Sequence, residues 1–381
     1  MCFFGTAVPV SLPPRKLKYM NTTKSILIRA DGNSEIATGH LRRCLSIADA
    51  LAELHVEAHF LVSDEISAGL LSSFFTPGNA YPIHLLHSDY RRPEAELSAL
   101  LPFLSAYPSW EKEAGRMPPS SDSVGRPILL VDSYFVTPAY LKALRQAACL
   151  VYMDDLLAFD YPVDLVVNYD FEPPAAFYTQ AKEALLGCRY TPLRKQFCDL
   201  SPIVRRSAHS LFLSTGGTDE QNITGNLLSA LLADPFFASW EFYTLTGPLH
   251  VHRRTLLQMA QKHPQIRLCE NVENMASLMS RCDLAASAAG TTLYELCAAG
   301  VPAISFTLAD NQQNVARDMQ QYAQLPYAGD VKAGKVLISN LHALLKSLAS
   351  DYEARLRLSA SMHAQIDGRG AWRIANALCA L

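Results

Sequence analysis

Apolar residues in the first half of the chain fall into two alternating patterns. Short, nearly unbroken apolar runs predict buried β-strands at 25–30, 56–62, 128–131, 149–153 and 165–167. Apolar residues spaced three and four apart predict helices at 92–104, at 138–147 and from Thr38, where one face carries Leu41, Cys44, Leu45, Ala48 and Leu51. Strands that alternate with helices in this way indicate βαβ units, and therefore a parallel sheet.

The same alternation returns in the second half, after a polar stretch at 198–209 that contains a proline and is expected to be a linker. Strands are predicted at 211–213, 241–245, 284–286 and 303–306, and helices at 220–233, 273–281 and 291–299, with further helical segments to the end. The sequence therefore predicts an α/β protein with two doubly wound, Rossmann-like halves that face each other across a cleft. We expect an N-terminal domain over 20–200 and a C-terminal domain over 201–381.

Two segments lack apolar periodicity and are expected to lie outside the domain cores. Residues 1–19 predict a disordered extension, so that the folded part begins near Met20. Residues 107–126 contain three prolines, four serines and two glycines, a composition typical of a mobile insertion loop. We expect both segments to be dispensable for folding and turnover.

Composition narrows the class of protein. With 381 residues, 49% apolar and 18% charged, the chain has material for two cores, which excludes wholesale disorder. A formal charge of −3 offers no broad cationic surface for nucleic acid or anionic membranes, and no apolar run reaches the ~20 residues of a spanning helix. The positive charges near the start follow the apolar residues, the reverse of a secretory signal. Nine cysteines without a Cys-x-x-Cys motif are expected to be reduced in the cytoplasm.

Glycine-bearing loops join predicted strands to the helices that follow them, at 29–40, 214–219 and 288–292. Backbone amides and the positive end of a helix favour an anion or an oxygen-rich ligand at such a loop, and two converging helix ends suit a diphosphate. Glu295, one turn into its helix, could accept both hydroxyls of a ribose. The glycines could equally serve tight turns alone. Neither of the two later loops has phosphate-loop or Gly-x-Gly-x-x-Gly spacing, which counts against kinase and dinucleotide-binding functions.

A series of short motifs occurs in a specific order along the chain. They are Arg-Ala-Asp-Gly…Gly-His-Leu-Arg-Arg-Cys-Leu (29–45), Val-Asp-Ser-Tyr (131–134), Met-Asp-Asp-Leu (153–156), Asp-Leu-Val-Val-Asn (164–168), Gly-Cys-Arg-Tyr-Thr-Pro-Leu-Arg (187–194), Ser-Thr-Gly-Gly-Thr-Asp (214–219), Ala-Ala-Gly-Thr-Thr-Leu-Tyr-Glu (288–295) and Leu-Ala-Asp-Asn-Gln (308–312). Together, from about residue 25 to the C-terminus, these motifs resemble the UDP-2,4-diacetamido-2,4,6-trideoxy-β-L-altropyranose hydrolases of pseudaminic acid biosynthesis. The resemblance implies the GT-B fold, in which the last helix, here from about residue 367, crosses back to the first domain.

The resemblance also implies roles for individual residues. His40 would be the catalytic base, and Tyr134 and Asn311 would line the sugar site. Arg194 and Glu295 would hold the substrate, Glu295 at the ribose. The other motif positions implied in substrate binding are Asp31, Gly39, Arg43, Gly216, Gly217, Gly290, Thr291 and Gln312. The sequence departs from the family's usual Gly-x-Gly-His loop at Ala37, which stands at the first glycine.

Several charged residues allow other interpretations. Asp154 and Asp155 are adjacent carboxylates that could bind a cation, but the sequence offers no third ligand, and the resemblance does not make them a metal site. His250 and His252 have the spacing of two ligands on a strand, but two arginines follow and would repel a cation, so a solvated loop is expected. Asp132, at a predicted strand end, is as consistent with orienting a neighbouring group as with touching substrate. We therefore expect no metal site and no cofactor.

The function expected from these residues is hydrolysis of a UDP-linked 2,4-diacetamido-2,4,6-trideoxyhexose at its anomeric C–O bond. The reaction would proceed with inversion and without a metal, releasing UDP and the free sugar for pseudaminic acid synthesis. We expect a cytoplasmic monomer whose partner is the UDP-sugar, with no nucleic acid partner and no membrane insertion. Two alternatives remain open: a GT-B glycosyltransferase with a UDP-sugar donor, and a catalytically silent nucleotide-sugar binding protein. Release of UDP without an acceptor alcohol distinguishes hydrolysis from both.

Overall fold

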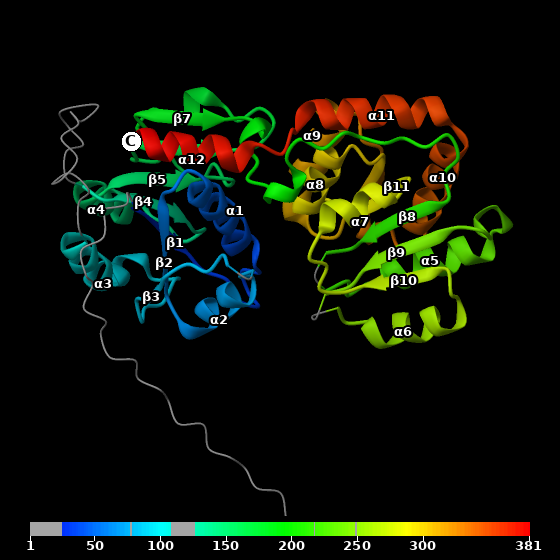
Figure 1. Ribbon diagram of the computed structural model, residues 1–381, viewed down its shortest axis with the longest axis horizontal. Coiled ribbons are helices and arrows are strands. Elements are labelled where there is room, and N and C mark those ends of the chain that lie inside the picture. Colours follow the sequence, from blue (N-terminus) through cyan, green and yellow to red (C-terminus); the bar gives the residue numbers. More distant parts are fainter. Residues whose placement is uncertain (1–24, 77, 108–125, 217, 248–249) are drawn as a thin grey trace, which may run out of the picture.

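The computed structural model of the protein describes residues 25–381 apart from 77, 108–125, 217 and 248–249. The described chain forms two lobes, each built on a parallel β-sheet covered by helices (Figure 1). The expected fold class, two doubly wound α/β halves, is confirmed. The expected extension 1–19 and nearly all of the expected insertion 107–126 lie outside the described residues.

The sheet of the first lobe consists of β1 (Ser25–Ala30), β2 (Glu57–Val62), β3 (Ile83–Leu85), β4 (Ile128–Asp132), β5 (Cys149–Met153), β6 (Leu165–Asn168) and β7 (Glu183–Leu186). These strands all run parallel, in the order β3-β2-β1-β4-β5-β6-β7. Strands β4 and β5 are buried along their whole length, as expected for apolar strands of a parallel sheet with both faces covered. Because the strand order reverses between β1 and β4, a crevice forms at the carboxyl ends of these two strands.

The helices of the first lobe are α1 (Gly39–Glu53), α2 (Glu65–Ser73), α3 (Pro93–Ala106) and α4 (Pro138–Ala147). Helices α1 and α2 pack with Ile26 and Ile28 on one face of the sheet. Helices α3 and α4 pack with Leu27 and Leu129 on the other face. Successive residues of β1 thus enter different cores, because side chains along a strand point alternately to the two faces.

The second lobe has the same plan. Its strands are β8 (Ser210–Ser214), β9 (Glu241–Leu245), β10 (Ile266–Cys269), β11 (Leu284–Ala288), β12 (Ala303–Thr307) and β13 (Tyr327–Asp330), all parallel in the order β10-β9-β8-β11-β12-β13. Its helices are α5 (Ile223–Ala233), α6 (Arg253–Lys262), α7 (Met275–Arg281), α8 (Thr291–Ala299), α9 (Gln313–Ala323), α10 (Lys335–Ser350) and α11 (Tyr352–Gln365). The strand order reverses between β8 and β11, which gives this sheet a crevice of its own.

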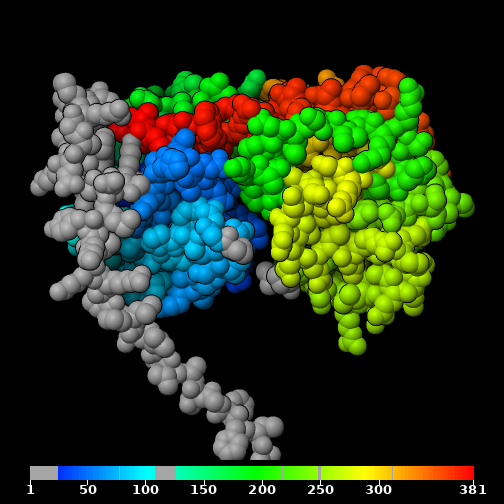
Figure 2. Space-filling model, in the orientation of Figure 1, coloured from blue at the N-terminus to red at the C-terminus, as the bar shows by residue number. Residues whose placement is uncertain are grey.

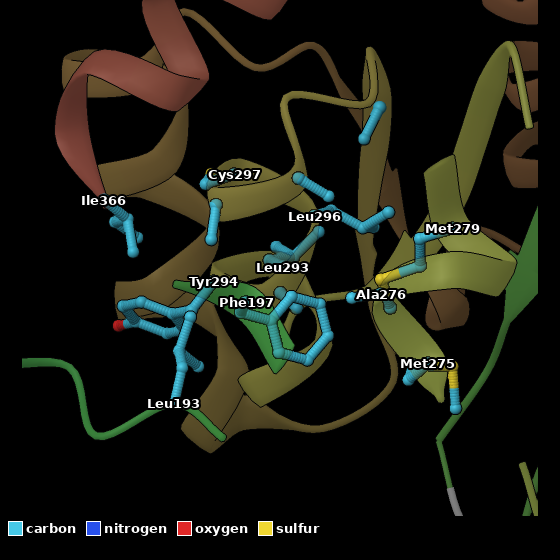
Figure 3. Packing of buried hydrophobic residues seen from close by; sticks show 14 of the residues in the cluster. Leu193, Phe197, Met275, Ala276, Met279, Leu293, Tyr294, Leu296, Cys297 and Ile366 are labelled. Atoms are coloured by element: carbon cyan, nitrogen blue, oxygen red, sulfur yellow. The ribbon is translucent and has the colours of Figure 1, made fainter. Parts of the chain in front are cut away.

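The chain passes between the lobes twice. The first passage contains the 3-10 helices η3 (Cys188–Tyr190) and η4 (Lys195–Phe197), and the second leads from α11 into α12 (Gly370–Ala380), which packs against α1 (Figure 1). The passages touch closely: a Cβ at Gly368 or Gly370 would lie 2.1 Å from a backbone oxygen of the first passage, so both positions require glycine. Figure 3 shows Phe197 and Ile366, one from each passage, in the apolar core around α8.

Away from these passages the lobes separate. In the space-filling view, a cleft divides the blue and cyan surface of the first lobe from the yellow surface of the second (Figure 2). In a doubly wound sheet the ligand binds where the strand order reverses, which here is at β1 and β4 in one lobe and at β8 and β11 in the other. Among the described residues, none of the helices combines the length and apolar character needed to cross a membrane.

Several short elements of the structure were not predicted from the sequence. Strands β3, β7, β10 and β13 have three or four residues each, too few for an alternating pattern to emerge. Helix α2 is also short, but its start carried a readable signal, because the Asp64 side chain accepts a hydrogen bond from the Ser67 amide in the first turn.

Candidate active site

His40 is the second residue of α1, directly after the loop that follows β1. The loop is closed by a hydrogen bond from the Asn33 amide to the Ala37 carbonyl, and Ala37 adopts a left-handed φ of 57°. Gly32 is tightly enclosed, because a Cβ there would lie 2.6 Å from Cδ1 of Leu41. This compact turn places the largely buried His40 at the carboxyl end of the sheet, beside the reversal of strand order.

Asp132 holds the imidazole of His40 from the neighbouring strand. It is the last residue of β4, and its Oδ1 lies 2.6 Å from Nδ1 of His40. Burial favours a raised pKa for Asp132, but the charge of Arg43 and the hydrogen bonds from Arg43 and His40 outweigh it and hold the pKa below its ordinary value. The ionised carboxylate accepts the Nδ1–H proton, which assigns the lone pair to Nε2. None of the described residues forms a hydrogen bond with Nε2, so His40 has the arrangement of an oriented general base.

Arg43 lies one turn after His40 and binds two carboxylates at once. Its Nε donates to Oδ2 of Asp132 at 2.5 Å, and its Nη1 donates to Oδ2 of Asp155 at 2.8 Å and to Oη of Tyr169 at 2.6 Å. Burial tends to lower the pKa of Arg43, but Asp132, Tyr169 and Asp155 together raise it well above its ordinary value. The guanidinium is therefore engaged with protein groups, and it fixes the carboxylate on which His40 depends.

Tyr134 places a partly exposed aromatic ring next to the base. Its ring meets the imidazole of His40 edge to face, with ring centres 4.3 Å apart, and its hydroxyl donates to Oδ2 of Asp155 at 3.3 Å. Tyr134 is 45% exposed and Leu156, which follows β5, is 50% exposed. The structure thus brings two exposed, largely apolar side chains to the loops after β4 and β5, on the same edge of the sheet as His40.

On the second lobe, Glu295 and Arg194 form an ion pair at the start of α8. Oε1 of Glu295 accepts from Nη2 of Arg194 at 2.7 Å. Burial raises the pKa of Glu295, although the charges of Arg194 and Arg42 oppose the shift. Because Arg42 belongs to α1, the helix of His40 also faces this carboxylate. Thr291 is exposed in the first turn of α8, and a Cβ at Gly290 would meet no atom within 4 Å, so there is open space beside this end of the helix.

The glycine loop after β8 lies beside the start of α8, because β8 and β11 are neighbours in the sheet. Gly216 has a left-handed φ of 79°, and Gly217 lies outside the described residues. Asp219 accepts hydrogen bonds of 2.8 and 2.9 Å from two amides in the first turn of α5.

The expectation of a solvated loop at 250–252 is wrong for His250, which is buried with Nε2 3.5 Å from Asp219. Gly39, at the start of α1, resembles Gly216 in having open space around its Cα.

Two more of the expected site residues, Asp31 and Gln312, do not join these groups. Oδ1 of Asp31 accepts from the amide and the hydroxyl of Ser63, and Oδ2 accepts from Arg29, so the carboxylate is enclosed within the first lobe. Oε1 of Gln312 accepts from the amide of Leu308 and closes its own loop. The side chain of Asn311 lies outside the described structure. A contact of these three residues with substrate stays a prediction.

Sequence reasoning missed the network behind the base. Asp132 was left open between two roles, and Asp155 and Tyr169 were not assigned to the site. The one available signal was topological: Asp132 ends a strand that pairs with β1, so its side chain had to emerge beside the loop that carries His40.

The adjacent carboxylates at 154 and 155 point to different partners. Asp154 accepts from the hydroxyls of Tyr161 and Tyr178 at 2.8 and 2.7 Å, and it also receives two backbone amides. Asp155 instead faces Arg43. Within the described residues, no group of three or more histidine, cysteine, aspartate or glutamate side chains is arranged to hold a metal ion.

Comparison with known proteins finds similarity to proteins named for carbohydrate biosynthesis or sugar transfer. Residues 214–369 match the glycosyltransferase family 28 C-terminal domain. The chain is 25% identical over 173 residues to the spore coat polysaccharide biosynthesis protein SpsG of Bacillus subtilis, an alignment that covers 45% of this chain and 50% of SpsG. It therefore spans about half the length of that relative. It is also 23% identical over 341 residues to the UDP-N-acetylglucosamine–N-acetylmuramyl-(pentapeptide) pyrophosphoryl-undecaprenol N-acetylglucosamine transferase of Salinibacter ruber, covering 84% of this chain and 88% of the transferase.

Solved structures share the fold at low sequence identity. MurG of Acinetobacter baumannii superimposes with a TM-score of 0.65 at 13% identity, covering 94% of this chain and all of MurG. UDP-GlcNAc 2-epimerase of Neisseria meningitidis, bound to UDP-GlcNAc, superimposes with a TM-score of 0.57 at 11% identity, covering 94% of this chain and all of the epimerase. The chain therefore has a GT-B-like fold with a family 28-like C-terminal half, and this fold carries more than one kind of chemistry.

Proposed function

We propose that this protein hydrolyses a UDP-sugar at the anomeric C–O bond and releases UDP and the free sugar. The observation that carries the proposal is the pair of His40 and Asp132, in which Nδ1 is held at 2.6 Å and Nε2 has no hydrogen-bonding partner among the described residues. A base of this kind activates water. The proposal is supported by the named UDP-sugar enzymes among the similar proteins and by the ordered motifs around His40.

The proposed step needs one base and no general acid. Nε2 of His40 takes a proton from water as the water oxygen bonds to the anomeric carbon. The bond from that carbon to the phosphate oxygen breaks, and its electron pair leaves with the diphosphate. Glycosidases protonate a departing alcohol with a second carboxyl group, but the diphosphate of UDP already spreads its charge. Attack from the face opposite the UDP gives inversion.

We assign the UDP to the second lobe. The glycine loop after β8 and the start of α8 follow neighbouring strands, and backbone amides there would favour the negative charge that develops on the diphosphate. Oε1 of Glu295 is occupied by Arg194, which leaves Oε2 to accept ribose hydroxyls. Arg194 lies on the first passage between the lobes, so it can contribute positive charge near the cleft.

We assign the sugar to the first lobe, beside His40. The exposed side chains of Tyr134 and Leu156 favour a sugar with an apolar edge, such as a deoxy carbon or the methyl group of an acetamide. This supports the 2,4-diacetamido-2,4,6-trideoxyhexose that the motif resemblance implies.

The test is a panel of UDP-sugars that includes the diacetamido-trideoxy sugar, with UDP release followed with and without acceptor alcohols. The proposal predicts release without an acceptor, reduced by about 10²–10⁴-fold in His40→Asn and retained in His55→Asn. His55 is a suitable control because it is exposed after the same helix and has a left-handed φ of 59°, which asparagine tolerates. Release only with an acceptor would make the protein a transferase, and binding without turnover would make it a silent binding protein.

A further inference from the structure

Tyr169 connects the base in the first lobe to a helix of the second lobe. It directly follows β6 and is 8% exposed, and its Oη accepts a hydrogen bond of 2.6 Å from Nη1 of Arg43. The rings of Tyr169 and Tyr294 of α8 pack edge to face, with ring centres 6.0 Å apart and ring planes at 83°. One side chain therefore contacts both the arginine behind the base and the helix that carries Glu295.

The contact on the second lobe is rigid. Tyr294 is 4% exposed and packs in the core that also holds Leu193 and Ile366 from the two passages (Figure 3). It immediately precedes Glu295, the residue proposed to bind ribose. Because a close-packed helix moves as one body, a change in the position of α8 on binding UDP reaches the ring of Tyr169.

On the first lobe, the hydrogen bond from Arg43 to Tyr169 helps to fix the position of the guanidinium. Nη1 of Arg43 is shared between Tyr169 and Asp155, while Nε and Nη2 hold Asp132. Nη2 also lies 3.1 Å from Nδ1 of His40. If the hydroxyl of Tyr169 is removed, Nη1 keeps only its contact with Asp155, whose side chain is 22% exposed, and the guanidinium loses one of the restraints that hold it against Asp132. The orientation of His40 depends on that carboxylate.

We propose, building on the proposed hydrolase, that Tyr169 is a positioning residue: its hydroxyl keeps Arg43 on Asp132, and its ring links the His40–Asp132 pair to helix α8. The orientation of the base is thereby coupled to occupation of the nucleotide site in the other lobe. Through this coupling, His40 is correctly oriented only when the nucleotide is correctly bound, although Tyr169 does not touch the reacting atoms.

The matched variants are Tyr169→Phe and Tyr178→Phe. Each variant removes one buried hydroxyl that is hydrogen-bonded to a buried charged side chain. That side chain is Arg43 for Tyr169, and for Tyr178 it is Asp154, to which Oη donates at 2.7 Å. Tyr169→Phe keeps the ring contact with Tyr294. We expect kcat for UDP-sugar hydrolysis to fall about tenfold in Tyr169→Phe, the kinetic equivalent of one hydrogen bond to a charged group, with KM unchanged. We expect kcat to be unchanged in Tyr178→Phe, and equal losses of kcat in the two variants would overturn the positioning role.

A second measurement does not depend on turnover. UDP affinity is measured by calorimetry, and the imidazole signals are followed by NMR on histidine-labelled protein, with His40→Asn assigning the signal of His40. We expect UDP to shift the His40 signal in the wild type and in Tyr178→Phe, and to shift it much less in Tyr169→Phe at unchanged UDP affinity. An undiminished shift in Tyr169→Phe would overturn the coupling. A wild-type protein that neither binds UDP nor releases it from a UDP-sugar would overturn the proposed function instead.

Discussion

The imidazole of His40 and the carboxylate of Asp132 meet at 2.6 Å although 92 positions separate them in the sequence. The contact exists because β1 and β4 are neighbours at the point where the strand order of the first sheet reverses. The helix that follows β1 supplies the base, and the end of β4 supplies its anchor. Histidine–carboxylate pairs of this kind fix the tautomer of the imidazole and its orientation.

Replacing Asp132 by asparagine removes the negative charge from this anchor. The buried Arg43 then keeps only one of its two carboxylate partners, Asp155, so we expect the free energy of unfolding to fall by about 2 kcal/mol at neutral pH and turnover to fall by about 10²-fold or more. Because the pKa of Asp132 is lowered in the folded protein, its stabilisation is present above the ordinary pKa and is lost as the pH falls below it. Denaturant melts should therefore show the difference between wild type and Asp132→Asn shrinking below about pH 4. A constant difference down to pH 2 would contradict the ionised, paired state of Asp132.

Asp170 has the opposite shift and gives a prediction of opposite sign. Burial, together with the charges of Asp155 and Asp318, raises its pKa to about 6. The folded protein therefore holds this proton more tightly than the unfolded chain, and stability is lost as the pH rises through about 4 to 6. We expect Asp170→Asn to stabilise the protein by about 2 kcal/mol at pH 8 and by nothing at pH 4. Thermal melts at both values test this, with Glu220→Gln as an exposed control, and a gain at pH 4 as large as that at pH 8 would refute it.

Ala37, in the loop that precedes His40, is an alanine with a φ of 57°. A left-handed conformation strains an alanine, while glycine adopts it freely but gains entropy when unfolded. We expect Ala37→Gly to raise the free energy of unfolding by about 0.5–1 kcal/mol. The control is Ala52→Gly, at an exposed position in the last turn of α1, which should instead lower it by up to about 1 kcal/mol. Destabilisation in both variants would show that the loop does not strain Ala37.

Turnover should not require a divalent cation. In the proposed step, the glycine loop after β8, the start of α8 and Arg194 supply the positive charge that the leaving diphosphate needs. We expect UDP release to be unchanged after dialysis against EDTA. Activity that disappeared in EDTA and returned with Mg²⁺ would contradict the proposed step, and would direct attention to Asp155, the more exposed of the two adjacent carboxylates.

The sequence predicted the buried strands and amphipathic helices because each carries its own apolar period. Its ordered motifs, through their resemblance to a known family, also pointed to His40, Tyr134, Arg194 and Glu295 as candidate site residues. The apolar pattern did not predict contacts between segments far apart in the sequence. The partners of Arg43 are an example, because they come from three different strand ends. The short edge strands escaped prediction for a similar reason, since three or four residues pair only when a neighbouring strand offers its backbone.

The central claim is that His40 activates water, and one measurement tests it most directly. Single-turnover and steady-state rates of UDP release are compared for wild type, His40→Asn and His55→Asn, with binding of the UDP-sugar measured on the same samples. The account predicts that His40→Asn binds the UDP-sugar as tightly as wild type and loses about 10²–10⁴-fold in turnover, the range of a general base, while His55→Asn keeps both. Full turnover in His40→Asn, or equal losses of binding and turnover, would contradict it.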